Sequence, residues 1–311
     1  MISDNDHVMI TGAAGLIGSR LCRLILDQST AKVICLDNGS IGNSRIEDDR
    51  VIWIDADVTS ENLWTVFDSH SITHLVHLAA HPGSKSVREP SLDVLVNAYG
   101  STRIFEWCAR NDVPIIYLSS SVVYGEKENV QIRESEDVDP GTIYGVCKIA
   151  NENSLRILER AYGLKWTVLR VFATYGVGHN PSTTQGIVNV MLTQLLSGNP
   201  IVVKGALERV KDMIHVDDTA AAIAHCINNP VTLNTVLNVG TGNGVSVQEL
   251  ISKLCLELGK NYADLDIVVE EATVGDTMFN IANIDRLIRS GFNPQTSLDE
   301  GLKKFVRNRK R

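Results

Sequence analysis

The sequence predicts an α/β fold of the doubly wound type, in which helices cover both faces of a mostly parallel sheet. Three observations support this prediction. Short apolar runs alternate with longer helical patterns over the first half of the chain, the runs end in small or polar residues, and a glycine-rich turn follows the first run. Buried strands separated by helices of this length are typical of βαβ units. Ligands of such sheets bind beyond the carboxyl ends of the strands.

Six apolar runs are the expected strands of this sheet. In chain order they are HVMIT (7–11), KVICLD (32–37), VIWIDAD (51–57), HLVHLAA (74–80), PIIYLSSS (114–121) and WTVLRVF (166–172). We therefore expect a Rossmann-type domain over residues 1–174, which the segment of about 212–242 joins again. After residue 175 the pattern becomes irregular. Residues 175–211 and 243–311 are expected to form a smaller α/β lobe that binds substrate.

Composition and charge disfavour several classes of function. The net charge is −8, whereas a nucleic-acid ligand requires a basic face, so the terminal RNRKR is interpreted as a solvated helix end. The six cysteines show no CxxC spacing, which argues against a metal site or a disulfide framework and fits a reducing cytosol. No apolar run has the length of a membrane span. We expect a cytoplasmic protein.

The glycine-rich turn, TGAAGLIGS, predicts a dinucleotide site. Gly12 provides the tight turn, Gly15 lets the backbone approach a pyrophosphate, and Gly18 allows close packing of the helix on the sheet. Leu16 and Ile17 lie at the start of that helix, whose N-terminus attracts the negative charge. The motif has the strand–turn–helix context that gives it meaning.

An acidic residue at the end of the second strand favours NAD over NADP. Asp37 can accept both hydroxyls of the adenosine ribose and would repel a 2′-phosphate, and the neighbouring Asn38 carries no positive charge. A helix-capping or turn role is the alternative for Asp37, and Arg45 weakens the preference for NAD because it could reach the site. Asp57, followed by Val58, is placed near the adenine, with a turn aspartate as the alternative.

The stretch TIYGVCK (142–148) contains a tyrosine and a lysine one helical turn apart. This spacing alone is common on helices. A tyrosine accepts a proton from a substrate hydroxyl only when its phenolate is stabilised below its ordinary pKa of about 10. The ammonium of Lys148 would supply such a field to Tyr144, and it would also bind the nicotinamide ribose.

Together these motifs resemble the extended short-chain dehydrogenase/reductase family, especially its nucleotide-sugar epimerases and dehydratases. The resemblance runs nearly from end to end. The motifs on which it rests, in the order in which the family has them, are TGAAGLIG, HLAA (77–80), Asn97, SSSVVYG (119–125), YGVCK, RVFATYG (170–176), KDMIHVDD (211–218), NVGTG (238–242) and VGD (274–276).

The resemblance implies further site residues. Counting back five from Gly125 gives Ser120 as the serine that contacts the substrate oxygen, and its neighbour Ser121 stays open. Capping of backbone groups is the alternative for these serines. Further contacts to NAD are expected from Leu78, Ala79, Ala80, Asn97, Ser119 and Val171.

Departures from the family pattern bear on the reaction and on the substrate. Dehydratases and decarboxylases carry an acidic residue just before VYG, where this chain has Ser121 and Val122, so oxidation and reduction at one carbon is favoured. The asparagine and the two arginines usual near the nucleotide are Ala173, Lys211 and Thr273 here. Because bidentate arginine binds a diphosphate best, we expect few strong contacts to the diphosphate in this chain. Arg209 could substitute for a missing arginine. The remaining candidate substrate contacts are His81 and His179, and His215 is interpreted as structural.

These inferences predict an NAD-dependent epimerase that inverts C4 of a nucleotide-linked hexose through a keto intermediate. One alternative is a dehydrogenase or ketoreductase of the same family, and another is a non-catalytic NAD-binding regulator, since fold alone does not determine function. The helices around 91–110 and 142–162 carry apolar residues on more than one face. The family commonly dimerises through this pair as a four-helix bundle, so a homodimer is expected.

Overall fold

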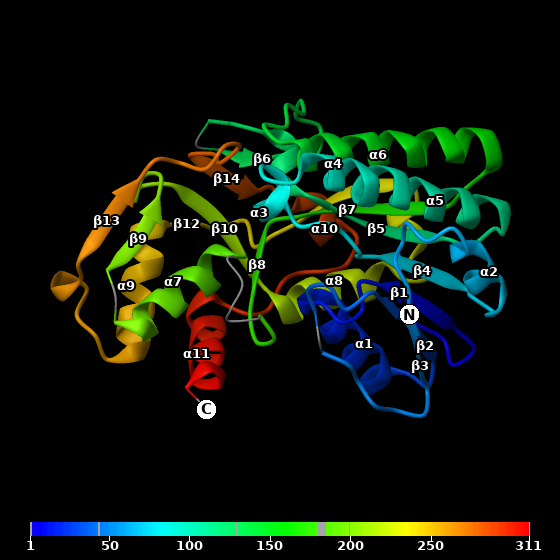
Figure 1. Ribbon diagram of the computed structural model, residues 1–311, viewed down its shortest axis with the longest axis horizontal. Coiled ribbons are helices and arrows are strands. Elements are labelled where there is room, and N and C mark those ends of the chain that lie inside the picture. Colours follow the sequence, from blue (N-terminus) through cyan, green and yellow to red (C-terminus); the bar gives the residue numbers. More distant parts are fainter. Residues whose placement is uncertain (1, 43, 129, 180–184, 199, 311) are drawn as a thin grey trace.

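The computed structural model describes residues 2–42, 44–128, 130–179, 185–198 and 200–310. Its centre is a parallel seven-stranded sheet, which confirms the predicted doubly wound α/β class (Figure 1). The six predicted strands are β1 to β5 and β7, and a seventh strand, β11, completes one edge. The order across the sheet is β3 (Val51–Asp55), β2 (Lys32–Asp37), β1 (His7–Thr11), β4 (His74–His77), β5 (Ile115–Ser120), β7 (Trp166–Val171) and β11 (Thr235–Val239).

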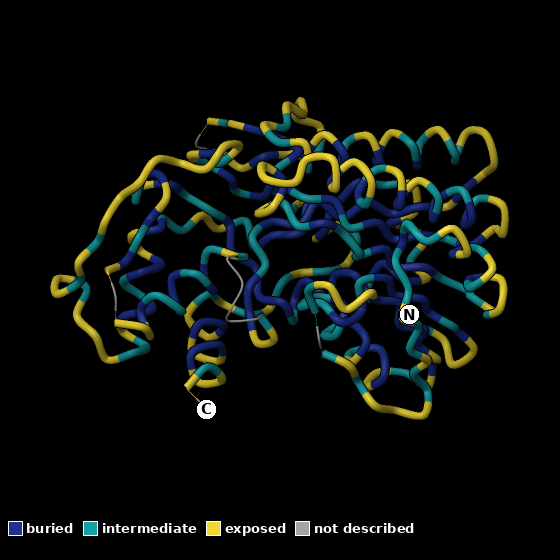
Figure 2. The backbone as a smooth tube through the Cα atoms, viewed as in Figure 1, coloured by how far each residue is buried: buried dark blue, intermediate teal, exposed yellow. Residues whose placement is uncertain are grey.

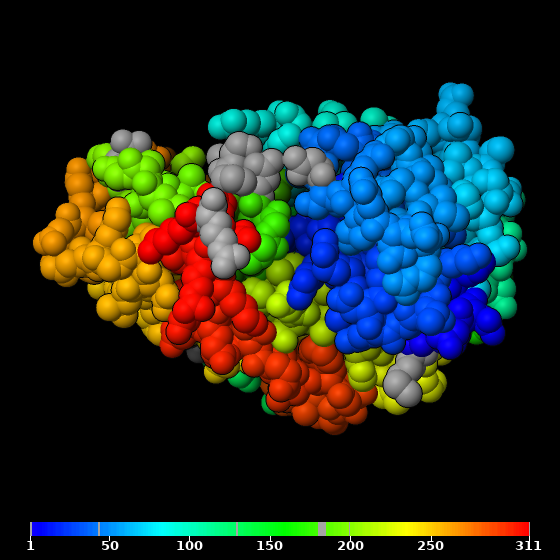
Figure 3. Space-filling model, turned by 90° about the horizontal axis from the view of Figure 1, so that it is seen from below, coloured from blue at the N-terminus to red at the C-terminus, as the bar shows by residue number. Residues whose placement is uncertain are grey.

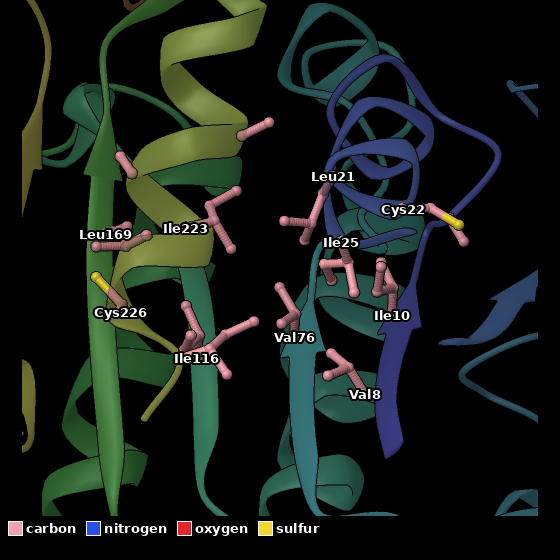
Figure 4. Packing of buried hydrophobic residues seen from close by; sticks show 14 of the residues in the cluster. Val8, Ile10, Leu21, Cys22, Ile25, Val76, Ile116, Leu169, Ile223 and Cys226 are labelled. Carbon is pink, nitrogen blue, oxygen red and sulfur yellow. The ribbon is translucent and has the colours of Figure 1, made fainter. Parts of the chain in front are cut away.

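Alternate residues of each strand enter two different cores, as the period of a strand requires. One core lies under α1 (Leu16–Gln28) and α8 (Val216–Cys226) and takes Val8 and Ile10 from β1. Figure 4 shows these side chains meeting Leu21 and Ile25 of α1. The other core takes Met9 and lies under α2 (Leu63–Asp68), α5 (Ser101–Arg110) and α6 (Ile143–Tyr162). Both faces are covered, so near-continuous apolar strands are expected.

The segment between β4 and α5 is broken into three short helical pieces. It consists of α3 (Gly83–Ser86), α4 (Pro90–Asp93) and a π-helix, η1 (Val94–Gly100), which leads directly into α5. The sequence pattern predicted one continuous helix here. π-Helical turns are rare and are often found at functional sites.

Local signals fix where α6 begins and ends. The Thr142 side chain accepts a hydrogen bond of 3.1 Å from the Gly145 backbone, which caps the first turn. Gly163 ends the helix in the left-handed conformation with φ 73°. Tyr144 therefore lies in the first turn of α6, beside the carboxyl end of β5.

A smaller lobe carries the remaining sheets (Figure 1). Its main sheet has the order β12 (Gly244–Ser246), β10 (Val210–His215), β14 (Phe279–Ala282) and β6 (Gln131–Ile132), with β8 (Ala173–Tyr175) on β10 and a separate pair of β9 (Ile201–Lys204) and β13 (Ile267–Glu270). The helices of this lobe are α7 (Ile187–Ser197), α9 (Val247–Leu258) and α11 (Leu298–Arg309), with the short 3-10 turn η4 (Tyr262–Asp264). The other 3-10 turns belong to the larger lobe, where η2 (Ser121–Tyr124) follows β5 and η3 (Pro230–Thr232) packs on β11. Figure 3 shows the N-terminal segments (blue) and the C-terminal segments (orange and red) on opposite sides of one face.

Some of the described segments cross the predicted domain boundaries, which stay a prediction. β6 lies within 1–174 but pairs with β14 in the smaller lobe. α10 (Asp285–Arg289) lies within 243–311 but packs on β11 and adds Leu287 to the core of the larger lobe. In the described part of the chain, no helix is both long and apolar enough to cross a membrane.

A buried ion pair joins α6 to the strand β7. The Glu152 carboxylate accepts hydrogen bonds of 3.0 and 2.7 Å from Nε and a terminal nitrogen of Arg170, and both side chains are almost fully buried. It also accepts a hydrogen bond of 2.6 Å from the hydroxyl of Ser119 on β5. One carboxylate therefore holds the helix to two adjacent strands.

We predict that Glu152→Ala lowers the free energy of unfolding by about 3–5 kcal/mol, because it leaves the Arg170 guanidinium buried without its partner. Urea unfolding measures the change. The control is Lys165→Ala, which removes an exposed pair with Asp112 and should cost less than about 1 kcal/mol. A cost for Glu152→Ala as small as the control's would contradict this account of α6.

Candidate active site

A cavity of about 610 Å³ opens at the carboxyl ends of β1, β2, β4 and β5. β1 and β4 are adjacent in the sheet although β2 and β3 lie between them in the chain, and ligands of open α/β sheets bind at this kind of switch point. Many of the predicted contact residues line it: Gly12, Gly15, Leu16, Ile17, Gly18, Asp37, Asn38, Asp57, Val58, Leu78, Ala79, Ala80, His81, Tyr144 and His179.

The glycine turn has the close packing that its sequence predicts. Gly12 adopts φ +71°, and a Cβ there would lie 2.7 Å from the Ala79 nitrogen. A Cβ on Gly18 would lie 2.3 Å from the Gly12 oxygen. The corresponding atom on Gly15 would meet only the Gly12 oxygen, at 3.2 Å. This backbone and the N-terminus of α1 therefore form a cradle that fits a pyrophosphate.

The Asp37 carboxylate lies at the cavity and braces two turns. One oxygen accepts a hydrogen bond of 2.9 Å from the Ala14 amide, and the other accepts 2.8 Å from the Gly39 amide. Arg45, which could have favoured a 2′-phosphate, pairs with Asp55 and lies over the ring of Trp53 instead. The residues around Asp37 thus fit the two ribose hydroxyls of NAD.

A second carboxylate lies beside it. The Asn38 amide donates a hydrogen bond of 2.6 Å to Asp57, and the Thr59 hydroxyl donates another of 2.6 Å. Partial burial by itself would raise the pKa of Asp57, but the hydrogen bonds from Thr59 and Asn38 outweigh burial, so the pKa is lowered. Asp57 is therefore a charged acceptor at the end of the cavity proposed for adenosine.

The structure brings Tyr144 and Lys148 together. The Lys148 ammonium lies 5.4 Å from the centre of the Tyr144 ring and 4.7 Å from that of Tyr117, and it donates a hydrogen bond of 2.6 Å to the Leu118 carbonyl. Burial lowers the pKa of Lys148 to about 8. Burial raises the pKa of Tyr144, and the charge of Asp93 adds to the increase. Without a bound ligand the phenol is thus the favoured form.

The three serines of β5 and η2 differ in what they contact. The Ser119 hydroxyl donates to Glu152, so its side chain faces α6. Ser120 Oγ accepts a hydrogen bond of 3.4 Å from the Val122 amide and caps η2. Capping of backbone groups is the alternative that the sequence left open for this serine. None of the three side chains lines the cavity, but Leu118 does. Because side chains alternate along a strand, Ser120 lies on the same side as Leu118, which favours it over Ser121.

Two other predicted cofactor contacts lie behind the cavity wall. Asn97, in η1, accepts a hydrogen bond of 2.8 Å from the His81 amide and donates one of 2.9 Å to the His81 carbonyl. The Asn97 backbone carbonyl accepts a hydrogen bond of 2.5 Å from the side-chain amide of Asn151 in α6. Val171 packs in the core under α1. The geometry thus assigns Asn97 a positioning role, because it holds the backbone that follows β4.

The predicted substrate contacts lie in two groups. Arg209 and Lys211 share the carboxylate of Asp276, with Lys211 Nζ at 2.8 Å, and burial together with the charge of Arg209 lowers the pKa of Lys211 to about 8. This cluster lies beside the start of α6, since a Cβ on Gly275 would meet the Thr142 methyl at 2.3 Å. The other group consists of Ala173 in β8, which does not line the cavity, and the two histidines, which do.

Sequence reasoning missed two segments that line the cavity. One is the loop after β2, which passes so close to the glycine turn that a Cβ on Gly42 would lie 2.2 Å from the Ala14 oxygen. The other follows His81, and there a Cβ on Gly83 would lie 3.2 Å from the Tyr144 ring. Glycines followed by short polar runs were the available signal. The missed lining residues include Ser40, Ile41, Gly42, Ser44, Pro82, Gly83, Ser84, Lys85, Glu89, Thr174 and Gln185.

Known proteins share this fold and this sequence pattern. The solved UDP-glucose 4-epimerase of Thermotoga maritima with UDP-glucose has a TM-score of 0.91 and 30% identity, covering 98% of each chain. The Thermus thermophilus UDP-glucose 4-epimerase complex with NAD has a TM-score of 0.89 and 28% identity, covering 97% of this chain and 98% of that one. UDP-glucuronate 4-epimerase 1 of Arabidopsis thaliana is 29% identical over 98% of this chain and 77% of its own.

The match to a family model covers most of the larger lobe and part of the smaller one. Residues 8–240 match the model of the NAD dependent epimerase/dehydratase family. The match includes the glycine turn, the carboxylates at the cavity and the Tyr144–Lys148 pair. It confirms the resemblance found in the sequence, and this chain belongs to the NAD dependent epimerase/dehydratase family.

Proposed function

We propose that this chain is an NAD-dependent epimerase of a nucleotide-activated sugar that inverts C4 through a transient 4-keto intermediate. The observation that carries the proposal is that Tyr144 lines the same cavity as the glycine turn and Asp37, with the Lys148 ammonium behind it at 5.4 Å from the centre of its ring. The relatives and solved neighbours described above, which are UDP-glucose and UDP-glucuronate 4-epimerases, support the substrate class.

Each side chain has a defined part in this chemistry. When bound, NAD would supply a hydride acceptor and donor at C4. Tyr144 would accept the proton of the C4 hydroxyl as hydride leaves C4, and it would return that proton to the C4 oxygen when hydride is delivered to the opposite face of the rotated keto sugar, while Ser120 donates a hydrogen bond to the same oxygen. The Lys148 ammonium, 5.4 Å from the centre of the ring, is the cation that would stabilise the phenolate against burial, which raises the Tyr144 pKa. Elimination lacks its acid, since Ser121 and Val122 precede VYG.

The diphosphate of the substrate is assigned to Arg209 and Lys211. Both cations are engaged by Asp276, and Lys211 also donates to the Thr277 carbonyl and hydroxyl at 2.6 and 2.9 Å. A dianionic ligand would compete with Asp276 for these donors. We include His81, His179 and Ala173 as further substrate contacts. Both ring nitrogens of His81 face carboxylates, so its contact with the sugar would be through carbon atoms.

We predict that the purified protein retains NAD and interconverts the C4 epimers of a UDP-hexose or a UDP-hexuronate without added cofactor. No net oxidation occurs in an epimerisation, so NAD is regenerated in each cycle. Turnover is measured by chromatography of the sugar nucleotides. Strict dependence on stoichiometric NAD(H) would favour a dehydrogenase or ketoreductase instead, and absence of turnover on every sugar nucleotide would favour a regulator.

We predict that Tyr144→Phe lowers kcat about 10²–10⁴-fold, because proton transfer at C4 loses its base. NAD binding, read by calorimetry, should change less than threefold, since the ring remains in place. Tyr162→Phe is the matched control, because Tyr162 is an exposed residue at the far end of the same helix and should leave kcat unchanged. Full activity of Tyr144→Phe would exclude the proposed mechanism.

We also propose a homodimer in the cytoplasm. Ile143, Val146 and Ile157 are exposed and form one stripe along α6, spaced by three and eleven residues. Leu95 and Tyr99 of the adjacent η1 are exposed as well. Figure 2 shows exposed turns along the outer sides of α4, α5 and α6. A second copy of this helix pair would cover the apolar stripe as a four-helix bundle. The cytoplasmic location is inferred from six free, buried cysteines, which fit a reducing compartment.

We predict that Val146→Glu combined with Ile157→Glu converts the dimer into a monomer, because two carboxylates would be buried in each half of the interface. Sedimentation velocity gives the mass. Leu256→Glu is the control, since Leu256 is exposed on α9 of the smaller lobe and should leave the mass unchanged. A monomeric mass for the unmodified chain would refute the dimer.

A further inference from the structure

A buried histidine lies between two carboxylates at the cavity. His81 Nδ1 is 2.8 Å from Asp93 Oδ1, and His81 Nε2 is 2.9 Å from Glu89 Oε2. His81 is 6% exposed and Asp93 is fully buried, whereas Glu89 reaches solvent. An imidazolium donates from both ring nitrogens, and therefore it satisfies both contacts at once. A neutral ring would place a lone pair against one carboxylate.

The same histidine fixes the segment that packs on Tyr144. Asn97 holds the His81 backbone amide and carbonyl, as described above. Five residues later, the hydroxyl of the buried Ser86 accepts a hydrogen bond of 3.1 Å from the Tyr144 amide. Between them, Gly83 approaches the Tyr144 ring. The segment 81–86 is thus clamped at both ends, once to η1 and once to the first turn of α6.

Asp93 places a negative charge beside the proposed base. α4 packs on α6, and the Asp93 charge disfavours ionisation of Tyr144 and of Cys147. One Asp93 oxygen accepts from both His81 and the Asn97 amide, while the other is buried without a hydrogen bond among the described residues. A charge this poorly solvated acts strongly on its neighbours unless a cation contacts it.

We propose that His81 is a positioning residue, whose imidazolium neutralises Asp93 and thereby protects the Tyr144 phenolate while it clamps the segment 81–86. The proposal rests on the proposed function of Tyr144, and it adds a residue that the proton-transfer pair requires. Glu89 accepts from the second ring nitrogen at the solvent side. A neutral side chain at this position would keep the clamp in part but would leave the carboxylate unopposed.

Several charged or titratable groups face Tyr144, and the test has to separate them. Lys148 stabilises the phenolate and is itself influenced by Glu152, and the Arg209–Lys211–Asp276 cluster lies beyond Thr142. These groups are common to all variants below. The remaining groups are Cys147 on α6, Tyr117 on β5, Asp93 on α4, and His81, Lys85 and Glu89 around the segment 81–86.

We predict that His81→Gln shifts the acid limb of the pH–rate profile upward by about one pH unit. The base form of Tyr144 is the phenolate, so activity rises with pH through the Tyr144 pKa, and an unopposed Asp93 raises that pKa further. Asp93→Asn should shift the limb downward, and in that background His81→Gln should shift it by less than about 0.3 unit. Arg88→Gln, which removes an exposed cation two residues after the segment 81–86, is the control and should shift nothing.

A second readout does not need turnover. In the NAD complex, ionisation of Tyr144 is measured as tyrosinate absorbance, by the difference between each variant and the same variant carrying Tyr144→Phe. The same shifts are expected, and thermal melting identifies variants that fail to fold. A His81→Gln shift that is absent, or that persists undiminished with Asp93→Asn, would overturn the proposal. Loss of epimerase activity in the unmodified protein would defeat the proposed function alone, because the absorbance experiment still decides the role of His81.

Discussion

The position of α6 against the ends of β5 and β7 is the constraint on which the site depends. Lys148 reaches back to the Leu118 carbonyl of β5, and one turn later Glu152 binds β5 through Ser119 and β7 through Arg170. These contacts are buried, so they are short and directional, and each would be costly to break. They set the rotation of the helix about its axis. That rotation determines which residue of the first turn meets the cavity, and the residue is Tyr144.

The electrostatics of the cavity follow from this arrangement. Lys148 has been withdrawn from water far enough to lower its pKa to about 8, while burial raises the pKa of Tyr144. The ionisation of each group therefore depends on the other, and both are sensitive to any charge nearby. Within the described residues, Asp93 acts against the phenolate and His81 contacts Asp93. A site of this kind is tuned by charged groups other than the proton-transferring pair itself.

The fold and the local motifs could be predicted from the sequence because they depend on short-range patterns. The strands followed from apolar runs, and the glycine turn followed from one loop whose packing demands are local. The cavity wall after β4 was harder to predict. The contacts of His81 with Glu89 and Asp93 depend on the helix breaks at 86–90 and on the π-helix. Neither feature can be predicted from the hydrophobic periodicity of the sequence. The engagement of Arg45 by Asp55, and of Arg209 and Lys211 by Asp276, depends on pairings across the fold that no motif encodes.

The π-helix η1 holds one residue more than α-helical winding would need over the same rotation. Only Asn97 and Gly100 of its seven residues are buried, and a Cβ on Gly100 would lie 2.9 Å from a Val58 methyl. The exposed Leu95 and Tyr99 belong to the proposed dimer interface, so their exposure in one copy does not free them to vary. Removing a single residue would let the turn return to α-helical winding, and the helix before it would keep nearly the same rotation relative to α5. The segment should thus absorb the loss of one residue more easily than the replacement of Asn97 or Gly100.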